Sequence, residues 1–434
     1  MVNALLDAVA ARKTPWIRVE TGWLSGEDLT HALKDSDEQY EIVLVLDRDG
    51  AAAVLADALA LSSAGQLPLL WPSRVAIPTW LRTLLAEPAT ACRALWSIIG
   101  DRYPQSTLIG VCSSGTSGTG KVVILDVARC LNCAREVAAR HGANPSSSPR
   151  IVVSLRSIAY SAGFVADALG SLFSGSWFWH PSHAAPELFT RSAGRMDLTD
   201  ASLRCTGAVA ERLLRTSMPA PQQLVLSGDL ISSGFVRALR SRWPTTDVWI
   251  AYGLAEAGPR VAVDKVAEDY RTGELPTLLS GVSVSIIAGE LIVSSPYAAL
   301  AVLDGSGPRA VASGRISTGD RAVVDSRGRF LLQGRRDATF AVAGTGVQTD
   351  LVEAQLRDHG ILASVTPLRQ GWRVTVTGAL ESATMDGDRN ARAAIRGLVR
   401  KRFPFLPAPD VTFAPAPALT VAGKRIPSSP ATRS

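Results

Sequence analysis

A run of small and hydroxyl-bearing residues carries the clearest chemical signal in the chain. It consists of Ser113, Ser114, Gly115, Thr116, Ser117, Gly118, Thr119, Gly120 and Lys121. Glycine opens backbone conformations that other residues avoid, and successive N–H groups in such a loop can surround an anion. The hydroxyls add hydrogen-bond donors, and the lysine adds a positive charge. The pattern therefore predicts a loop that binds a polyphosphate.

The loop matches the Walker A pattern of P-loop NTPases only in part. Residues 115–121 fit its first seven positions, but the eighth, where that pattern has a magnesium-binding Ser or Thr, is Val122. The segments on either side, 107–112 and 122–125, are apolar and partly β-branched, which favours strands. A loop between two strands has no helix N-terminus behind the phosphates. We therefore predict a phosphate loop outside the P-loop NTPase fold.

The bulk composition limits the possible classes of protein. The chain has 434 residues, of which 47% are hydrophobic, so it can bury a large core divided between two or three domains. No apolar run reaches the roughly 18–20 residues of a membrane-spanning helix, and residues 1–7 lack a basic-then-apolar signal pattern. The net charge of +6 comes without a dense basic tract. We expect a cytoplasmic protein that binds anionic small molecules rather than membranes or nucleic acid.

The cysteines do not form a metal-binding pattern. Five are scattered through the chain, and Cys130 and Cys133 are the one pair with ligand-like spacing. A zinc site would need a second pair of ligands, for which His180 and His183 are the candidates. Nothing in the sequence connects the two pairs, so we expect structural thiols.

The order of apolar segments predicts a mostly parallel α/β sheet in the first part of the chain. Expected strands lie at 41–46, 67–71, 150–155, 223–227 and 247–252, and expected helices at 51–64, 127–141, 161–173 and 233–243. The last two strands are followed by Gly228-Asp229 and by Gly253 to Glu256. Ligands of α/β sheets bind at such carboxyl ends, so we expect these residues to lie in a binding site.

The pattern changes twice in the second part of the chain. Short alternating strands at 282–287, 290–293, 322–325 and 330–333 predict a small antiparallel barrel or curled sheet. After residue 337 come short strands, a helix at 388–403 and a Pro-rich tail, typical of a separate α+β domain. We therefore expect a large N-terminal domain of α/β sheets with a small β-barrel subdomain (1–334), a junction at 335–337 and a small C-terminal α+β domain (338–434).

Six stretches in this order resemble the adenylate-forming superfamily, which includes acyl-CoA and aryl-CoA ligases, nonribosomal peptide adenylation domains and luciferases. They are the loop 113–121, Gly228-Asp229, Tyr252-Gly253-Leu254-Ala255-Glu256, Ser317-Thr318-Gly319-Asp320, Gly334-Arg335-Arg336-Asp337 and Gly423-Lys424. The resemblance covers the chain from about residue 41 to Lys424. It implies that a small-molecule carboxylic acid attacks the α-phosphorus of ATP, which releases pyrophosphate and leaves an acyl-adenylate. It also implies a thiol acceptor, either CoA or the phosphopantetheine arm of a carrier protein.

The resemblance implies a nucleotide-binding role for most of the matched residues. The set comprises Ser113, Ser114, Gly115, Thr116, Ser117, Gly118, Thr119, Lys121, Gly228, Asp229, Tyr252, Gly253, Ala255, Asp320 and Arg335. Tyr252 would offer a ring on which adenine stacks. Asp320 would accept hydrogen bonds from the ribose hydroxyls, because a carboxylate is an acceptor with two oxygens. Arg335 would contact ribose or phosphate with its planar fork.

Three residues are implied in catalysis and movement. Glu256 would bind Mg²⁺, a cation that takes carboxylate and phosphate oxygens. Lys424 would bridge the substrate carboxylate and the α-phosphate, where charge builds up in the transition state. Asp337 would be the hinge about which a mobile C-terminal domain rotates to admit the thiol.

The chain departs from the family pattern at positions that bear on substrate and acceptor. Gly120 stands where the family has Pro, which we expect to make the loop more flexible, and Ala255 stands where most members have Thr. The segment after the hinge differs from the family pattern, and this affects thiol transfer more than adenylation. Residues 157–161 lack the Asp of amino-acid-activating domains, which favours an aryl or alkyl acid over an α-amino acid. A non-thiol acceptor, an unusual oxyacid such as nitrite, and a nucleotide-binding pseudoenzyme remain alternatives.

Overall fold

The computed structural model describes most of the chain after residue 107 and shorter segments before it. The described residues are 17–19, 22–24, 42–46, 58, 67–72, 76–86, 94–95, 97–99, 108–113, 120–141, 151–181, 198–312, 314–342, 345–368, 371–377 and 385–414. The expected helix at 51–64 lies outside them apart from residue 58, as do residues 114–119 and Lys424. Within these ranges, no helix is both long enough and apolar enough to span a membrane.

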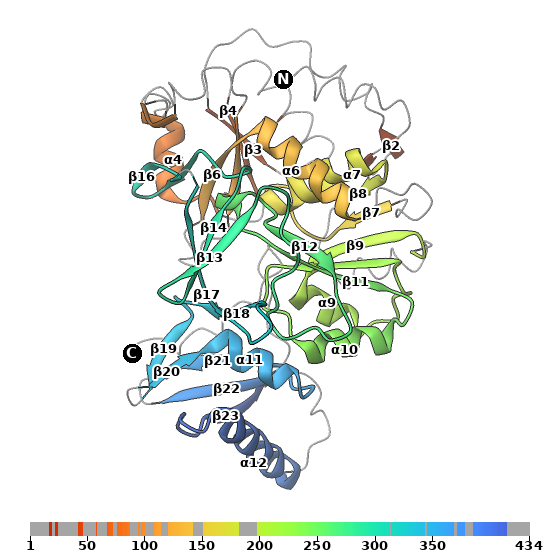
Figure 1. Cartoon of the computed structure of the whole chain (residues 1–434), viewed down its shortest axis with the longest axis vertical. Helices are drawn as coiled ribbons and strands as arrows, with labels where there is room; N and C mark the ends of the chain where they lie inside the picture. Colours follow the sequence, from red (N-terminus) through yellow and green to blue (C-terminus); the bar gives the residue numbers. More distant parts are fainter. Residues whose placement is uncertain are drawn as a thin grey trace.

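An eight-stranded sheet forms one half of the large upper body in Figure 1. Its spatial order is β12 (Ala262–Lys265), β11 (Asp247–Tyr252), β10 (Gln223–Ser227), β9 (Ala201–Thr206), β7 (Ile151–Ser154), β8 (Trp177–Trp179), β1 (Ile17–Val19) and β2 (Gly22–Leu24). All neighbours from β11 to β1 are parallel, and β12 and β2 pair antiparallel at the two edges. The predicted parallel α/β arrangement is confirmed, and it brings the carboxyl ends of β10 and β11 to one edge.

A six-stranded sheet forms the other half and contains the two strands on either side of the predicted phosphate loop. Its order is β16 (Gly307–Ala310), β15 (Ala301–Asp304), β6 (Lys121–Asp126), β5 (Leu108–Ser113), β4 (Leu67–Trp71) and β3 (Ile42–Leu46). β5 and β6 pair antiparallel, with Ser113 opposite Lys121, so the loop connects two strands of one hairpin. The predicted strand–loop–strand arrangement is confirmed, and no helix begins at the described end of the loop.

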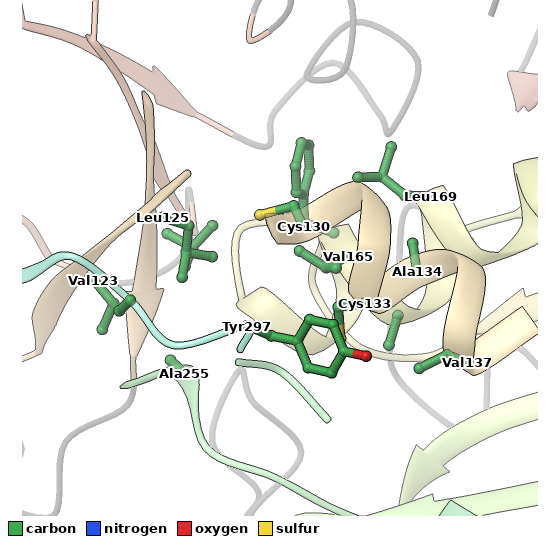
Figure 2. Close-up of a cluster of buried hydrophobic side chains, with 14 of the residues drawn as sticks. Val123, Leu125, Cys130, Cys133, Ala134, Val137, Val165, Leu169, Ala255 and Tyr297 are labelled. Atoms are coloured by element: carbon green, nitrogen blue, oxygen red, sulfur yellow. The ribbon is translucent and has the colours of Figure 1, made fainter. Parts of the chain in front are cut away.

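Helices fill the space around and between these sheets. They are α4 (Thr79–Ala86), α6 (Val127–Arg140), the π-helix η2 (Ala162–Leu169), α7 (Gly170–Ser174), α9 (Gly207–Leu213), α10 (Ser233–Arg242) and the single turn η3 (Ala255–Ala257). Apolar side chains of β6, α6 and η2 form a common cluster, part of which Figure 2 shows. A second cluster joins α9 and α10 to the opposite face of the eight-stranded sheet. The expected helix at 161–173 is therefore a π-helix followed by a short α-helix.

Two cysteines of α6 belong to the cluster in Figure 2. Cys130 and Cys133 are free and buried among apolar side chains, and burial raises the pKa of Cys133 to about 12. Both are therefore protonated thiols near neutral pH. Asp126 caps the start of this helix by accepting a hydrogen bond from the backbone N–H of Arg129 at 3.0 Å.

A four-stranded antiparallel sheet follows in the chain. Its order is β13 (Ser283–Ile287), β14 (Glu290–Ser294), β17 (Ile316–Val324) and β18 (Phe330–Arg335). The expected antiparallel subdomain is confirmed, but its described strands form an open sheet with β13 and β18 at the edges rather than a closed barrel. β17 and β18 place Asp320 directly opposite Arg335.

The residues after the junction form a small unit at the bottom of Figure 1. It contains β19 (Thr339–Val342), β20 (Thr345–Gln348), α11 (Thr349–Arg357), β21 (Ala363–Pro367), β22 (Trp372–Thr377), α12 (Met385–Arg402) and β23 (Asp410–Ala414). Its buried apolar residues, among them Val347, Trp372 and Val411, form a cluster of their own. The expected helix at 388–403 is α12, which begins three residues earlier, and α11 was not expected from the sequence.

Candidate functional site

The described end of the phosphate loop meets the carboxyl end of β11. Lys121 opens β6, and its Nζ donates to the Glu256 carboxylate in the turn η3 that follows β11. The two side chains are 28% and 17% exposed, so they form a partly shielded ion pair that small molecules can reach. The sequence predicted both residues at one site, and the structure brings them into contact.

Gly120 has a packing reason to be glycine. Its φ is +59°, a left-handed value that proline cannot adopt. A Cβ on Gly120 would also lie 2.7 Å from the ring of the fully buried Trp71. We expected this glycine to loosen the loop, but the described backbone packs it tightly against Trp71. The glycine fixes how the chain enters β6.

A second group of predicted residues meets where β11 faces the antiparallel sheet. Tyr252 donates its hydroxyl to Asp320 at 2.5 Å, and Arg335 Nη1 donates to the same carboxylate at 3.1 Å. Arg335 also donates to the backbone oxygen of Thr318 at 2.7 Å and to Asp337 at 3.1 Å. Burial and the Asp320 charge raise the pKa of Tyr252, so its hydroxyl stays protonated. The network fixes the tyrosine ring, the carboxylate and the guanidinium in one place.

Glu290 supports this network, although it lies outside the six stretches matched in the sequence. Its carboxylate accepts hydrogen bonds from the Ser317 hydroxyl and from Gly319 N–H at 2.8 Å, and it pairs with Arg336 at 2.5 Å. Burial would raise the pKa of Glu290, but these hydrogen bonds outweigh it and lower the pKa. Glu290 therefore holds, as an anion, the turn from which Asp320 projects. An isolated carboxylate at a strand start offers no signal that could have revealed this role.

The Gly228-Asp229 pair lies at the end of β10, as expected, but Asp229 is already engaged. Gly228 has a φ of +85°, which favours glycine. Asp229 Oδ2 accepts a hydrogen bond from Ala208 N–H at 3.0 Å, in the first turn of α9. A Cβ on Gly207 would lie 3.0 Å from the same oxygen. Asp229 therefore fastens the strand end to α9.

Gly253 and Ala255 shape the backbone between Tyr252 and Glu256. A Cβ on Gly253 would lie 2.4 Å from the backbone oxygen of Pro259, so a larger residue does not fit. Ala255 is 8% exposed and belongs to the apolar cluster in Figure 2. A hydroxyl-bearing residue at this position would bring a polar group into that cluster.

Asp350 also reaches this region, although the sequence did not single it out. It lies in the first turn of α11 and accepts a hydrogen bond from Arg335 N–H at 3.0 Å. Burial raises its pKa, the Arg335 N–H opposes this, and the charges of Asp229 and Asp320 raise it further. The small C-terminal unit therefore places a carboxylate beside the predicted nucleotide residues.

The three-dimensional comparisons identify the fold. The chain superposes on the anthranilate CoA ligase AuaEII, solved in complex with anthranoyl-AMP, with a TM-score of 0.76 and 13% identity over 98% of this chain and 95% of that one. It has the fold of the adenylate-forming enzymes. The benzoate CoA ligase of Burkholderia xenovorans LB400 gives a TM-score of 0.74 at 14% identity, with 98% of both chains covered. ATP-bound MatB of Rhodopseudomonas palustris gives 0.74 at 15% identity, with 98% and 96% covered.

Sequence comparison alone does not reach these proteins. No protein-family model matches the chain, and no curated protein matches it. At 13–17% identity these structures show a shared backbone fold. The adenylate-forming fold spans nearly the whole chain, including the small C-terminal unit.

Proposed function

We propose that this protein activates a carboxylic acid as its acyl-adenylate at the expense of ATP and then transfers the acyl group to a thiol. The acid is aryl or alkyl rather than an α-amino acid, and the thiol is CoA or the phosphopantetheine of a carrier protein. Two of the structural neighbours are an anthranilate and a benzoate CoA ligase, which supports an acid with a carboxylated ring.

One observation carries the proposal: the Lys121–Glu256 pair and the Tyr252–Asp320–Arg335 network are connected by the short segment between Tyr252 and Glu256. A cation suited to phosphates and a carboxylate suited to their Mg²⁺ ion thus stand beside a ring and a carboxylate suited to a nucleoside. This arrangement supports the proposal that an ATP molecule binds across the site.

The residues act by positioning and by charge. Asp320 and Arg335 would hold the ribose, Tyr252 would lie against adenine, and Lys121 would exchange Glu256 for the phosphates of ATP. An oxygen of the acid then attacks the α-phosphorus, the bond between the α- and β-phosphates breaks, and pyrophosphate leaves. Lys424 would balance the negative charge that develops at the α-phosphate. No covalent nucleophile from the protein is needed.

The residues at this site fit Mg²⁺. Magnesium takes one or two carboxylates together with phosphate oxygens. Glu256 is a partly buried carboxylate that pairs with Lys121, the last residue of the predicted phosphate loop. When bound, the ion would supply positive charge to the phosphates. Glu256 would hold it, and Lys121 would be free to move to the phosphates.

Thiol transfer would follow a movement of residues 338–434 about Asp337. The thiol sulfur, after losing its proton, attacks the acyl carbon, and AMP leaves with the electrons of the acyl–phosphate bond. Asp337 pairs with Arg335 Nε at 3.1 Å, so the hinge is fastened to the ribose-binding network in this arrangement of the domains. Rotation therefore requires that pair to open.

Acid-dependent pyrophosphate release tests the proposal. Purified protein is given ATP, Mg²⁺ and a panel of aryl and alkyl acids, with and without CoA, and adenylates are trapped with hydroxylamine. We expect release with at least one acid, and acyl-CoA when CoA is the acceptor. Lys424→Ala should still bind ATP but lose release. Absence of both ATP binding and pyrophosphate release with every acid contradicts adenylation.

A further inference from the structure

A buried ionic cluster lies between the eight-stranded sheet and the π-helix η2. Asp167 of η2 accepts hydrogen bonds from Arg156 Nη1 at 3.0 and 2.8 Å. Arg204 Nη1 and Arg260 Nη2 lie 3.5 and 3.8 Å from Asp167 Oδ1. All four side chains are at most 5% exposed. Three guanidinium groups therefore converge on one carboxylate in the protein interior.

The charges in this cluster do not balance. Among the described residues, Asp167 is the one carboxylate that pairs with Arg156, Arg204 and Arg260, which leaves an excess of two positive charges. His141 lies nearby but adds no charge, because burial and the arginine charges lower its pKa. Burial also lowers the pKa of Arg260 to about 9, and the Arg156 charge adds to this effect. Unbalanced buried charge is costly, so the cluster favours an additional anion.

The donors of the cluster are also incompletely used. The Nε atoms of Arg156 and Arg204 are buried and have no hydrogen-bond partner among the described residues. Arg156 uses its other nitrogens on Asp167 and on two backbone carbonyls of β9 and β10, at 2.8 and 3.1 Å. Arg260 hydrogen-bonds within its own segment, to the backbone oxygen of Pro259 at 2.9 Å. Arg260 is also the arginine farthest from Asp167, at 3.8 Å, so its guanidinium is the one least engaged by that carboxylate.

Arg260 lies beside the backbone of the predicted nucleotide residues. Arg260 comes four residues after Glu256 in the sequence. A Cβ on Gly253 would lie 2.9 Å from Arg260 Cα. The residue after Arg260 donates its N–H to the backbone oxygen of Tyr252 at 2.8 Å. Arg156 follows the carboxyl end of β7 at the same edge of the sheet. The segment that carries Tyr252 and Glu256 thus also carries Arg260, one of the four members of the cluster.

The element that carries the carboxylate is itself unusual. The η2 helix has π geometry over eight residues and begins directly after the 157–161 loop, where the chain departs from the family pattern. π-Helical turns are rare and occur frequently at functional sites. Gly163 allows η2 to pack closely, because a Cβ there would lie 2.3 Å from the backbone oxygen of Ser157. The local geometry of η2 places the Asp167 carboxylate within 4 Å of Arg156, Arg204 and Arg260.

We propose that this cluster forms an electropositive floor of the acid site and selects an acid that carries a second anionic group. The inference rests on the proposed adenylation and refines its substrate class. The reacting carboxylate would face the ATP site, and a second carboxylate would be received by Arg260. A carboxylate matches the guanidinium fork with paired, charge-assisted hydrogen bonds.

Matched acid pairs test this selectivity. Pyrophosphate release is measured with terephthalate against benzoate and with glutarate against pentanoate. The dicarboxylate of a pair should have a kcat/KM about tenfold higher or more, which corresponds to about 1.4 kcal/mol. Arg260→Met should reduce this ratio to near one, and Arg260→Lys should retain part of it. Methionine keeps much of the arginine volume, and Asp167 retains Arg156 and Arg204 as partners in this variant.

A control variant at the surface, together with the acids that fail to react, distinguishes failure of this inference from failure of the proposed function. Arg309→Met removes an exposed arginine that pairs with Asp304, and it should keep the wild-type ratio. Equal kcat/KM values for both members of each pair in the wild type overturn the inference but leave adenylation standing. An Arg260→Met variant that slows both acids by the same factor also overturns it, because Arg260 would then be structural. No release with any acid overturns the proposed function and this inference together.

Discussion

Replacing Gly234 with alanine should loosen the contact between the C-terminal unit and the large domain. Gly234 lies in the first turn of α10, and its N–H donates to Asp358 Oδ1 at 2.5 Å. A Cβ on Gly234 would lie 2.3 Å from Asp358 Cα and 2.8 Å from its backbone oxygen. Cβ atoms do not approach other atoms so closely, so Asp358 must move away and release its carboxylate from the helix.

The lost contacts set the size of the effect. The Asp358 carboxylate also accepts hydrogen bonds from Ser233 Oγ at 3.2 Å and Thr272 Oγ1 at 3.1 Å. A hydrogen bond to a charged group contributes roughly 1.5–3 kcal/mol, and a helix N-terminus adds roughly 0.3–1 kcal/mol for an anion. The neighbouring Arg357–Glu211 pair, at 2.5 Å, can remain. The Ser233 and Thr272 hydroxyls can rotate to follow the carboxylate, so the Gly234 N–H bond is the one that is lost. We therefore expect docking to weaken by about 2 kcal/mol, roughly 30-fold in its equilibrium constant.

Hydrogen exchange measured by mass spectrometry detects this loosening. Peptides covering 230–236 and 349–361 should exchange faster in Gly234→Ala, whereas peptides of the eight-stranded sheet should not change. Gly397→Ala is the matched control, because no atom lies within 4 Å of a Cβ there and alanine favours the α12 helix. If Gly234→Ala exchanges like the wild type and like Gly397→Ala in both peptides, the docking argument is wrong.

Three further substitutions test the site and its support. Glu256→Gln should lower pyrophosphate release by about 100-fold or more, because an amide lacks the negative charge with which Glu256 would hold Mg²⁺; pyrophosphate-release assays at saturating ATP measure this. Asp320→Asn should weaken ATP binding about tenfold, because Arg335 loses its charged partner, and calorimetric titration measures the dissociation constant. Asp167→Asn should lower the free energy of unfolding by about 3–5 kcal/mol, because it leaves buried arginines without their carboxylate, as urea unfolding will show.

The elements that hold the phosphate loop were predictable because their signals are local. Apolar, β-branched runs on both sides of the loop predicted two strands, and β5 and β6 form a hairpin around it. The segments after β10 and β11 were also placed correctly at one sheet edge, because parallel strands align their carboxyl ends. Short-range periodicity was sufficient for this part of the fold.

The ionic cluster could not be predicted from the same signals. Arg204 interrupts the pattern of β9, a strand that periodicity did not reveal, and Arg156 and Arg260 lie in connecting segments. Asp167 sits in an apolar stretch whose π geometry has no 3.6-residue signature. Only the three-dimensional arrangement shows that these four side chains contact one another in the protein interior. The role of Glu290 was missed for the same reason, since its partners Gly319 and Arg336 are far from it in the sequence.

The two ends of α11 connect the proposed domain rotation to nucleotide binding. At its start, Asp350 accepts the Arg335 N–H, and a Cβ on Gly334 would lie 2.8 Å from Asp350 Cβ. At its end, Asp358 holds the first turn of α10, close after the segment that carries Asp229. Rotation about the hinge must therefore release both ends of one helix. Arg335 also pairs with Asp320. A ribose that hydrogen-bonds to Asp320 would therefore change the contacts of Arg335, whose N–H donates to Asp350. On the proposed function, occupancy of the nucleotide site and the position of the C-terminal unit would thus be linked through Arg335.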